Sequence, residues 1–184
     1  MITYTTSSTE QELLGILQLQ QDNLVKHLTK EEIEGQGFVT VQHSFADIKK
    51  MNDIEQSIIA KNGEDVVAYL LAMTAASKND IPVLVPMFDA FDKLIFAGKT
   101  VSSYKYIVVG QVCVHKSFRG MGILDRTYQT YKEHFGQKYD FAITEIATKN
   151  LRSIKAHQRI GFKSINEYIA PDGEAWSIVI WDWN

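Results

Sequence analysis

Apolar and polar residues alternate along the first third of the chain in patterns that predict helices. A capping box over residues 9–12 precedes apolar residues at helical spacing, which predicts a helix over about residues 10–27. The capping signal recurs over residues 29–32, before a short acidic turn. A further one over residues 44–47 predicts a short helix that ends near residue 51.

The middle of the chain changes to shorter apolar runs that predict strands. Residues 56–73 predict a β-hairpin, because two β-prone runs flank Asn62-Gly63, a pair that favours a tight turn with positive φ. Residues 79–99 predict a helix, with Asp80 as a candidate cap and Pro86 as the site of a kink or restart.

The remainder of the chain alternates predicted strands with predicted helices. The strands are expected over residues 103–114, 141–147, 162–169 and 174–183, and the helices over about 121–137 and 150–160. This order predicts an α/β (α+β) fold in one domain, residues 1–184, with a mixed sheet and helices on both of its faces.

Composition and charge exclude several classes of protein. The 184 residues are 45% hydrophobic and carry a formal net charge of −3, which argues against a nucleic-acid scaffold. The single cysteine excludes an internal disulfide framework, and the histidines show no metal-ligand spacing, so no metal is expected. We find no signal peptide or membrane-length apolar run, and we expect a soluble, cytoplasmic protein without membrane or nucleic-acid partners.

One loop carries candidate chemistry. Residues 112–126, VCVHKSFRGMGILDR, read as strand, glycine-containing loop and helix. Backbone N–H groups of Arg119 to Ile123 at a helix N-terminus could bind an anion, with Lys116 and Arg119 adding charge. Alone, the same Gly-x-Gly is equally typical of an ordinary tight turn. It is neither a Rossmann fingerprint, because Asp125 replaces the third glycine, nor a P-loop.

Two motifs together resemble the GNAT superfamily of acetyl-CoA-dependent N-acetyltransferases. The loop Arg119-Gly120-Met121-Gly122-Ile123-Leu124 is similar to that family's Arg/Gln-x-x-Gly-x-Gly/Ala, except that leucine stands at the last place. The family's later motif, Asn-x-x-Ala/Ser-x-x-x-Tyr-x-x-x-Gly-Phe, resembles this chain in a second set of residues. These are Asn150, Ser153, Gly161 and Phe162, with His157 at the tyrosine position. The resemblance covers about residues 55–170 and is weak over the N-terminal helices and residues 77–104.

The resemblance implies a fold and a cofactor site. It implies the GNAT-like acyl-CoA N-acyltransferase fold, with a mixed, mostly antiparallel central sheet and a helical insertion at 77–104. Backbone groups of Val112, Cys113 and Val114 would lie against acetyl-pantetheine where two strands splay, and the Val112 N–H would polarise the acetyl carbonyl. The loop residues Arg119, Gly120, Met121, Gly122, Ile123 and Leu124 would hold the pyrophosphate of acetyl-CoA.

The resemblance also implies roles for four polar residues. Asn150 would cap the next helix and touch the CoA arm, or act as a cap only, and Ser153 lies one turn on. His157 would act as general acid toward the departing thiolate, or only pack beside the CoA arm. Glu145 matches the base of ribosomal-protein N-terminal acetyltransferases, or is a strand glutamate that pairs with a cation or positions the substrate.

Together these observations predict an N-acetyltransferase that transfers the acetyl group of acetyl-CoA to a primary amine of a small molecule or peptide. The alternative is a non-catalytic acyl-CoA-binding regulatory domain on the same fold, and an acyl group longer than acetyl is also open. We expect Cys113 to be a buried free thiol and not a nucleophile. Dimerisation is common in the family, and Trp176, Trp181 and Trp183 offer aromatic surface for a homodimer.

Overall fold

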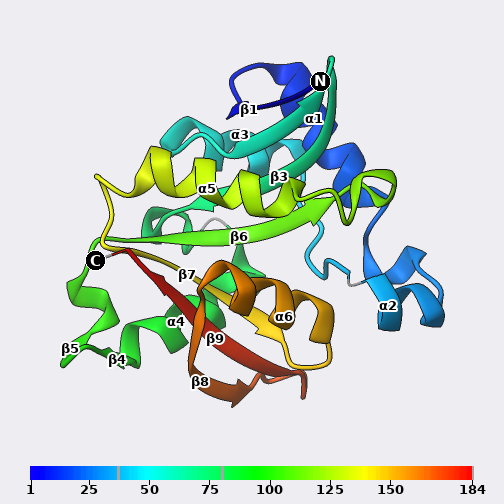
Figure 1. The fold of residues 1–184 in the computed structure, drawn as a ribbon. Helices are drawn as coiled ribbons and strands as arrows, with labels where there is room; N and C mark the ends of the chain where they lie inside the picture. Colours follow the sequence, from blue (N-terminus) through cyan, green and yellow to red (C-terminus); the bar gives the residue numbers. More distant parts are fainter. Residues whose placement is uncertain (37, 80, 184) are drawn as a thin grey trace.

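The fold is built on a seven-stranded sheet. The computed structural model describes residues 1–36, 38–79 and 81–183. The strands follow the spatial order β1-β2-β3-β6-β7-β9-β8, and every neighbouring pair is antiparallel except β6 and β7 (Figure 1). Their bounds are β1 Ile2–Thr6, β2 Ile58–Asn62, β3 Asp65–Met73, β6 Tyr106–Val114, β7 Phe141–Ala147, β8 Lys163–Ile169 and β9 Ala175–Asp182. The predicted mixed, mostly antiparallel sheet is confirmed.

Helices cover both faces of this sheet. The helices α1 (Glu10–Gln21), α3 (Phe45–Ile54) and α4 (Val85–Lys93) bury their apolar side chains in one core cluster, on one face. The helices α5 (Ile123–Phe135) and α6 (Leu151–Ile160) cover the other face, where α5 buries Tyr128 and Tyr131. The short helix α2 (Lys30–Gln36) lies beyond the end of β6 (Figure 1). Within the described residues, no helix is long and apolar enough to cross a membrane.

The predicted capping signals are confirmed, but the predicted end of the first helix is wrong. All three capping boxes form: Thr9 with Glu12 at α1, Thr29 with Glu32 before α2, and Ser44 with Asp47 at α3. However, α1 ends at Gln21, and residues Val25–His27 form a separate 3-10 turn. The reason is long-range pairing: Val25 N–H donates to the Val39 carbonyl at 3.0 Å, which holds this segment outside a continuous helix.

The segment between β3 and β6 differs from its prediction. The expected helix over 79–99 is limited to α4, which follows a 3-10 turn at Pro82–Leu84. A hairpin of β4 (Ile95–Phe96) and β5 (Lys99–Thr100) follows, turning through Ala97 and Gly98 with φ of 47° and 82°. Two consecutive positive φ values cannot continue a helix. Pro86 lies in the first turn of α4, where it starts the helix and does not kink it, and Asp80 lies outside the described residues.

The N-terminal strand β1 was missed by pattern reasoning. Its sequence ITYTT contains three threonines and lies at the edge of the sheet, with only every second residue partly covered. Such a polar edge strand is defined by pairing with β2, from Ile2 opposite Asn62 to Thr6 opposite Ile58, and not by an apolar run of its own.

The parallel strands β6 and β7 separate along their length. They pair only from Tyr106 opposite Phe141 to Val108 opposite Ile143 and then diverge toward the side where α2 lies (Figure 1). The register of β6 against β3 shifts between Leu70 and Ala72, so Gly110 and Gln111 form a bulge at this point. At the start of the gap, the Thr144 hydroxyl donates to the Val109 carbonyl at 2.8 Å.

Replacing Thr144 by valine therefore tests how the gap is stabilised. Thr144→Val keeps the side-chain shape but leaves the Val109 carbonyl without this donor, which we expect to lower the free energy of unfolding by about 1–3 kcal/mol. Urea denaturation measures the change. Thr130→Val is the control, because the Thr130 hydroxyl donates to Arg126 on the exposed face of α5 and its loss should cost under about 0.5 kcal/mol. Equal effects for both variants would contradict the assignment.

Candidate active site

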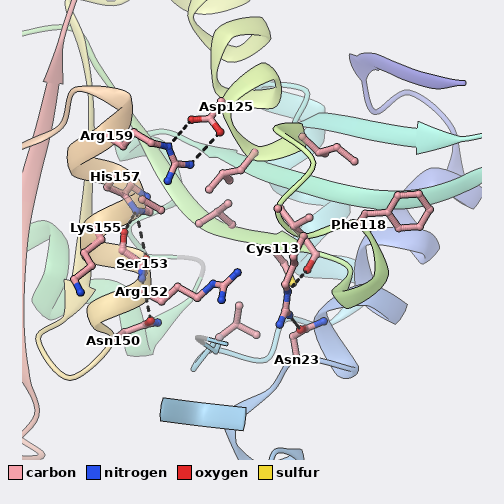
Figure 2. A pocket seen from close by; sticks show the side chains of 18 of the residues that line it. Asn23, Cys113, Phe118, Asp125, Asn150, Arg152, Ser153, Lys155, His157 and Arg159 are labelled. Carbon is pink, nitrogen blue, oxygen red and sulfur yellow. Dashed lines mark hydrogen bonds and ion pairs between the residues drawn. The ribbon is translucent and has the colours of Figure 1, made fainter. Parts of the chain in front are cut away.

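Two adjoining cavities open where β6 and β7 separate. The outer cavity has a volume of about 580 Å³ and lies between the end of β6, the start of α5 and the inner face of α6 (Figure 2). The inner cavity, of about 100 Å³, reaches past β7 to α4 and β9. The two cavities share part of their lining, namely Phe38, Val39, Val112, Asn150, Ser153 and His157.

Alternate residues of β6 direct their backbone N–H and C=O groups toward this opening. The His115 N–H donates to the Val67 carbonyl of β3 at 2.8 Å. Antiparallel pairing alternates, so Cys113 also faces Tyr69 of β3 with its backbone groups, whereas Val112 and Val114 turn theirs toward the gap. The Val114 carbonyl accepts from Arg119 Nε at 3.0 Å. The N–H of Val112 therefore faces the gap.

The thiol of Cys113 is unsuited to nucleophilic attack. The side chain is buried in the core beneath α1, and burial raises the pKa of the thiol to about 12. Only a thiolate is a competent nucleophile, so the neutral thiol packs as a small apolar group. The prediction of a buried free cysteine is confirmed.

The glycine loop leads into α5 with the geometry of an anion site. Gly120 and Gly122 adopt φ of 76° and 74°, and an added Cβ at either would meet no atom within 4 Å, so their backbone angles and not the available space require glycine. Gly122 caps α5 without any side-chain acceptor, which leaves the first N–H groups of the helix facing the outer cavity. Met121, in contrast, points its side chain into solvent, with 65% exposed.

Basic side chains surround the outer cavity. Arg152, Lys155 and Arg159 line it from α6, and Arg159 binds both carboxylate oxygens of Asp125 at 3.0 Å, across from α6 to the start of α5 (Figure 2). The Arg119 side chain also donates to the Asn23 Oδ1 at 2.6 Å, so it ties the glycine loop to the end of α1. Four basic residues and one acidic residue thus line the described part of this cavity, a balance that favours a polyanion.

Three polar residues follow one face of α6, as the motif spacing predicts. Asn150 caps the helix by accepting from the Ser153 N–H, and its Nδ2 donates to the Phe38 carbonyl at 3.2 Å. His157 Nδ1 donates to the Ser153 carbonyl at 2.8 Å, and because a carbonyl can only accept, Nδ1 carries the proton. Nε2 then accepts from the Tyr128 hydroxyl at 2.6 Å.

This environment favours a neutral His157. The side chain is buried, and desolvation lowers the pKa of the imidazole to about 4. At neutral pH the ring therefore lacks the charge that the general-acid hypothesis requires, and both of its nitrogens already have protein partners.

Glu145 lies in the inner cavity, and its pKa is shifted upward, opposite to that of His157. Burial raises the pKa of its carboxyl to about 7, while a hydrogen bond from the Tyr168 hydroxyl to Oε2, at 2.5 Å, partly offsets this increase. A carboxyl of this pKa is suited to accept a proton near neutral pH. Sequence reasoning missed Tyr168, because its contact depends on how β8 and β7 are both aligned against β9.

Further lining residues come from segments without any recognised motif. Val41 and its neighbours reach the inner cavity from the loop before α3, and Leu84 and Met87 reach it from the α4 segment. A buried network braces this loop: Gln111 Nε2 donates to the Val41 carbonyl at 2.8 Å, and its Oε1 accepts from Gln20 and Tyr69. Local patterns cannot reveal such contacts, since they join distant parts of the chain.

The three tryptophans proposed for a homodimer surface also have contacts within the chain. Trp176 lines the inner cavity, and the rings of Trp181 and Trp183 pack beside Tyr128 and Tyr131 respectively. The homodimer stays a prediction.

Comparisons with known proteins agree with this fold. The chain is similar over its full length to the ribosomal-protein-S18-alanine N-acetyltransferase from Escherichia coli, with 11% identity, 95% of that chain covered and a TM-score of 0.64. It is similar to a chain of the NatC complex bound to Gag peptide and CoA, with 11% identity, 98% of each chain covered and a TM-score of 0.65. A putative acetyltransferase from Salmonella typhimurium with its cofactor acetyl-CoA has 11% identity and a TM-score of 0.63, with 100% of this chain and 94% of that chain covered. At these identities the likeness shows the fold.

A search of curated proteins found no match. The model of the acetyltransferase (GNAT) family matches residues 22–162, well over half of the chain. The protein therefore belongs to the GNAT family of acetyltransferases, has the fold of that family and is an acyltransferase.

Proposed function

We propose that this protein transfers the acetyl group of acetyl-CoA to a primary amine, with both substrates bound at once. The observation that carries the proposal is the pair of cavities on either side of the β6–β7 gap. The outer cavity is large and basic, and the inner one is small, with Glu145 as the only acid among its described lining residues. Such an arrangement suits a polyanionic donor on one side and an amine on the other.

The donor is proposed to lie along β6, with its phosphates at the start of α5. The uncapped N–H groups after Gly122 and the basic side chains of α6 favour phosphate there. The acyl arm would follow Val112 and Val114, and the Val112 N–H would stabilise the negative charge that develops on the thioester oxygen. One such fixed donor is worth about 3 kcal/mol in the transition state.

Glu145 is proposed to be the base. The amine nitrogen forms a bond to the acetyl carbon, the carbon–sulfur bond of the thioester breaks, and its electron pair leaves with the CoA thiolate. The proton lost by the amine passes to Glu145, directly or through a water molecule. His157 is proposed to act as a positioning residue, which holds Ser153 and the α6 face against α5 through Tyr128.

A glycine variant tests the donor site. Gly122→Ala places a side chain at a φ of 74°, which we expect to lower stability by about 1–2 kcal/mol and to turn the helix N-terminus away from phosphate. The affinity for CoA, measured calorimetrically, should fall at least about tenfold through the loss of those N–H contacts.

Gly63→Ala is the matched control, because Gly63 has a φ of 64° in the β2–β3 turn and lines neither cavity. It should lose similar stability and keep its CoA affinity. If the two variants bind CoA equally well, the glycine loop is not the phosphate site.

Amine-dependent release of CoA thiol over a panel of amines tests the reaction itself. Glu145→Gln should lower kcat at least about tenfold, because the amide cannot accept the proton. The rate of the unchanged protein should fall as the pH drops below about 7, since the carboxyl with its raised pKa becomes protonated there. Tight CoA binding without release by any amine would support the non-catalytic alternative instead.

Tyr168→Phe tests whether protonation of Glu145, and not of another group, causes the fall in rate at low pH. The tyrosine hydroxyl favours the charged carboxylate, so its loss should raise the pKa of Glu145 further and move the acidic limb of the profile to higher pH. An unmoved limb would show that another group, such as the substrate amine, controls the rate.

A histidine variant distinguishes positioning from proton donation. His157→Phe leaves the buried Tyr128 hydroxyl without its acceptor, which should reduce the free energy of unfolding by about 1–3 kcal/mol. We expect kcat to change less than about threefold, because the neutral imidazole is a weak acid and its one N–H is held by the Ser153 carbonyl. A tenfold or larger loss of kcat at unchanged KM would restore the general-acid role.

A further inference from the structure

The lining of the inner cavity limits which amines it can accept. This inference rests on the proposed function and concerns the side of the gap that faces α4 and β9. Most of the cavity wall is apolar, formed by Val41, Leu84, Met87, Val109, Ile146 and Trp176. An amine that reaches Glu145 must therefore carry apolar atoms next to its amine-bearing carbon, or leave this surface in contact with water.

The charges of the cavity point the same way. Among the described residues that line it, Glu145 is the only acid, no lysine or arginine is present, and His157 is neutral. Tyr168 occupies one oxygen of Glu145, which leaves the other for a single amine. Beyond the one bond to Glu145, a second ammonium or a carboxylate on the acceptor would be buried here without an oppositely charged partner, and such burial is strongly unfavourable.

The wall is braced, so its size is fixed before the acceptor binds. Leu84 and Met87 are buried in the main core cluster, with 6% and 5% of their surfaces exposed. Elsewhere in the lining, Gln111 holds the Val41 carbonyl at 2.8 Å and Asn150 holds that of Phe38 at 3.2 Å. These parts of the lining are thus held by contacts already present in the protein.

We propose that the acceptor is a monoamine whose amine-bearing end is compact, apolar and otherwise uncharged. The same chemistry is found in small alkyl or arylalkyl amines and at the N-terminus of a peptide that begins with an apolar residue. Polyamines and free amino acids are excluded, because each brings a second charge close to the first.

Matched amines test the proposal in the acetyl-CoA assay. Isoamylamine is compared with 1,5-diaminopentane, and leucinamide with leucine, because each pair differs by one added charge. We expect kcat/KM to be at least about tenfold higher for the singly charged member of each pair. A tripeptide that begins with leucine distinguishes a peptide acceptor from a small amine. Equal or better turnover of the diamine or of free leucine would overturn the proposal.

Cavity variants test whether the α4 segment sets the size limit. Met87→Ala should raise kcat/KM for 2-phenylethylamine relative to isoamylamine at least about fivefold, as enlarging an apolar pocket permits a larger group. Leu84→Val is a smaller change in the same wall, should act in the same direction and serves if Met87→Ala does not fold. Ile95→Ala is the control, because Ile95 lies in the β4 strand of the same segment and is 64% exposed. An unchanged ratio in both wall variants would overturn the role of α4.

Amine binding, measured without turnover, tests this inference separately from the proposed transfer reaction. If no amine is acetylated, thermal shifts of the CoA-loaded protein with the same amines still decide between the outcomes. Selective stabilisation by isoamylamine and leucinamide would support the acceptor class while the transfer reaction fails. Stabilisation by the diamine or by leucine, or by none of the amines, would overturn it.

Discussion

The interrupted pairing of β6 and β7 is the constraint on which the rest of the structure depends. Two parallel strands that hydrogen-bond over only three residue pairs leave backbone donors and acceptors inside the molecule without strand partners. Some are satisfied locally, as when Thr144 donates to the Val109 carbonyl and Arg119 to that of Val114. The N–H of Val112 faces the gap, where the proposed function places the acyl donor.

Burial at this gap has opposite effects on its two titratable groups. Glu145 lies on the face of β7 that looks toward α4, and His157 lies on α6 on the other face. Removing water disfavours the charged form of each, which raises the pKa of the carboxyl to about 7 and lowers that of the imidazole to about 4. One group therefore exchanges a proton near neutral pH, while the other becomes a neutral hydrogen-bonding residue. The same physical cause therefore brings the carboxyl into the neutral pH range and keeps the imidazole uncharged.

Segments that are far apart in the chain hold the walls of the site in place through hydrogen bonds. The Gln111 side chain belongs to the bulge of β6, yet it binds Gln20 of α1, Tyr69 of β3 and the Val41 carbonyl. Arg119 joins the glycine loop to Asn23 after α1 in a similar way. Arg119 is thus partly engaged in holding the glycine loop in place. The basic residues of α6 supply the other positive charges that line the outer cavity.

Local signals in the sequence determined the capping of α1 and α3, the hairpin turn at Asn62-Gly63 and the glycines of the α5 loop. Each depends on backbone preferences within a few residues, which do not require the rest of the chain. The family motifs identified Asn150, Ser153 and His157 as site candidates, and their helical spacing places these side chains on one face of α6. Cys113 was also read correctly as buried, since it lies between apolar neighbours in a strand.

Only the tertiary structure decided the ionisation states, the shape of the inner cavity and the extents of several elements. Tyr168 meets Glu145 through strand register, Leu84 and Met87 line the same cavity through the packing of the α4 segment, and β1 exists through pairing with β2. The helix expected over residues 79–99 is limited to α4 and is followed by the β4–β5 hairpin, and α1 ended early because Val25 pairs with Val39. Apart from that hairpin, whose paired residues are close in sequence, these outcomes depend on contacts between residues far apart in the chain, whose free energies exceed local propensities of a few tenths of a kcal/mol per residue. The chemistry of the site depends on those contacts, because they decide which groups lose their water.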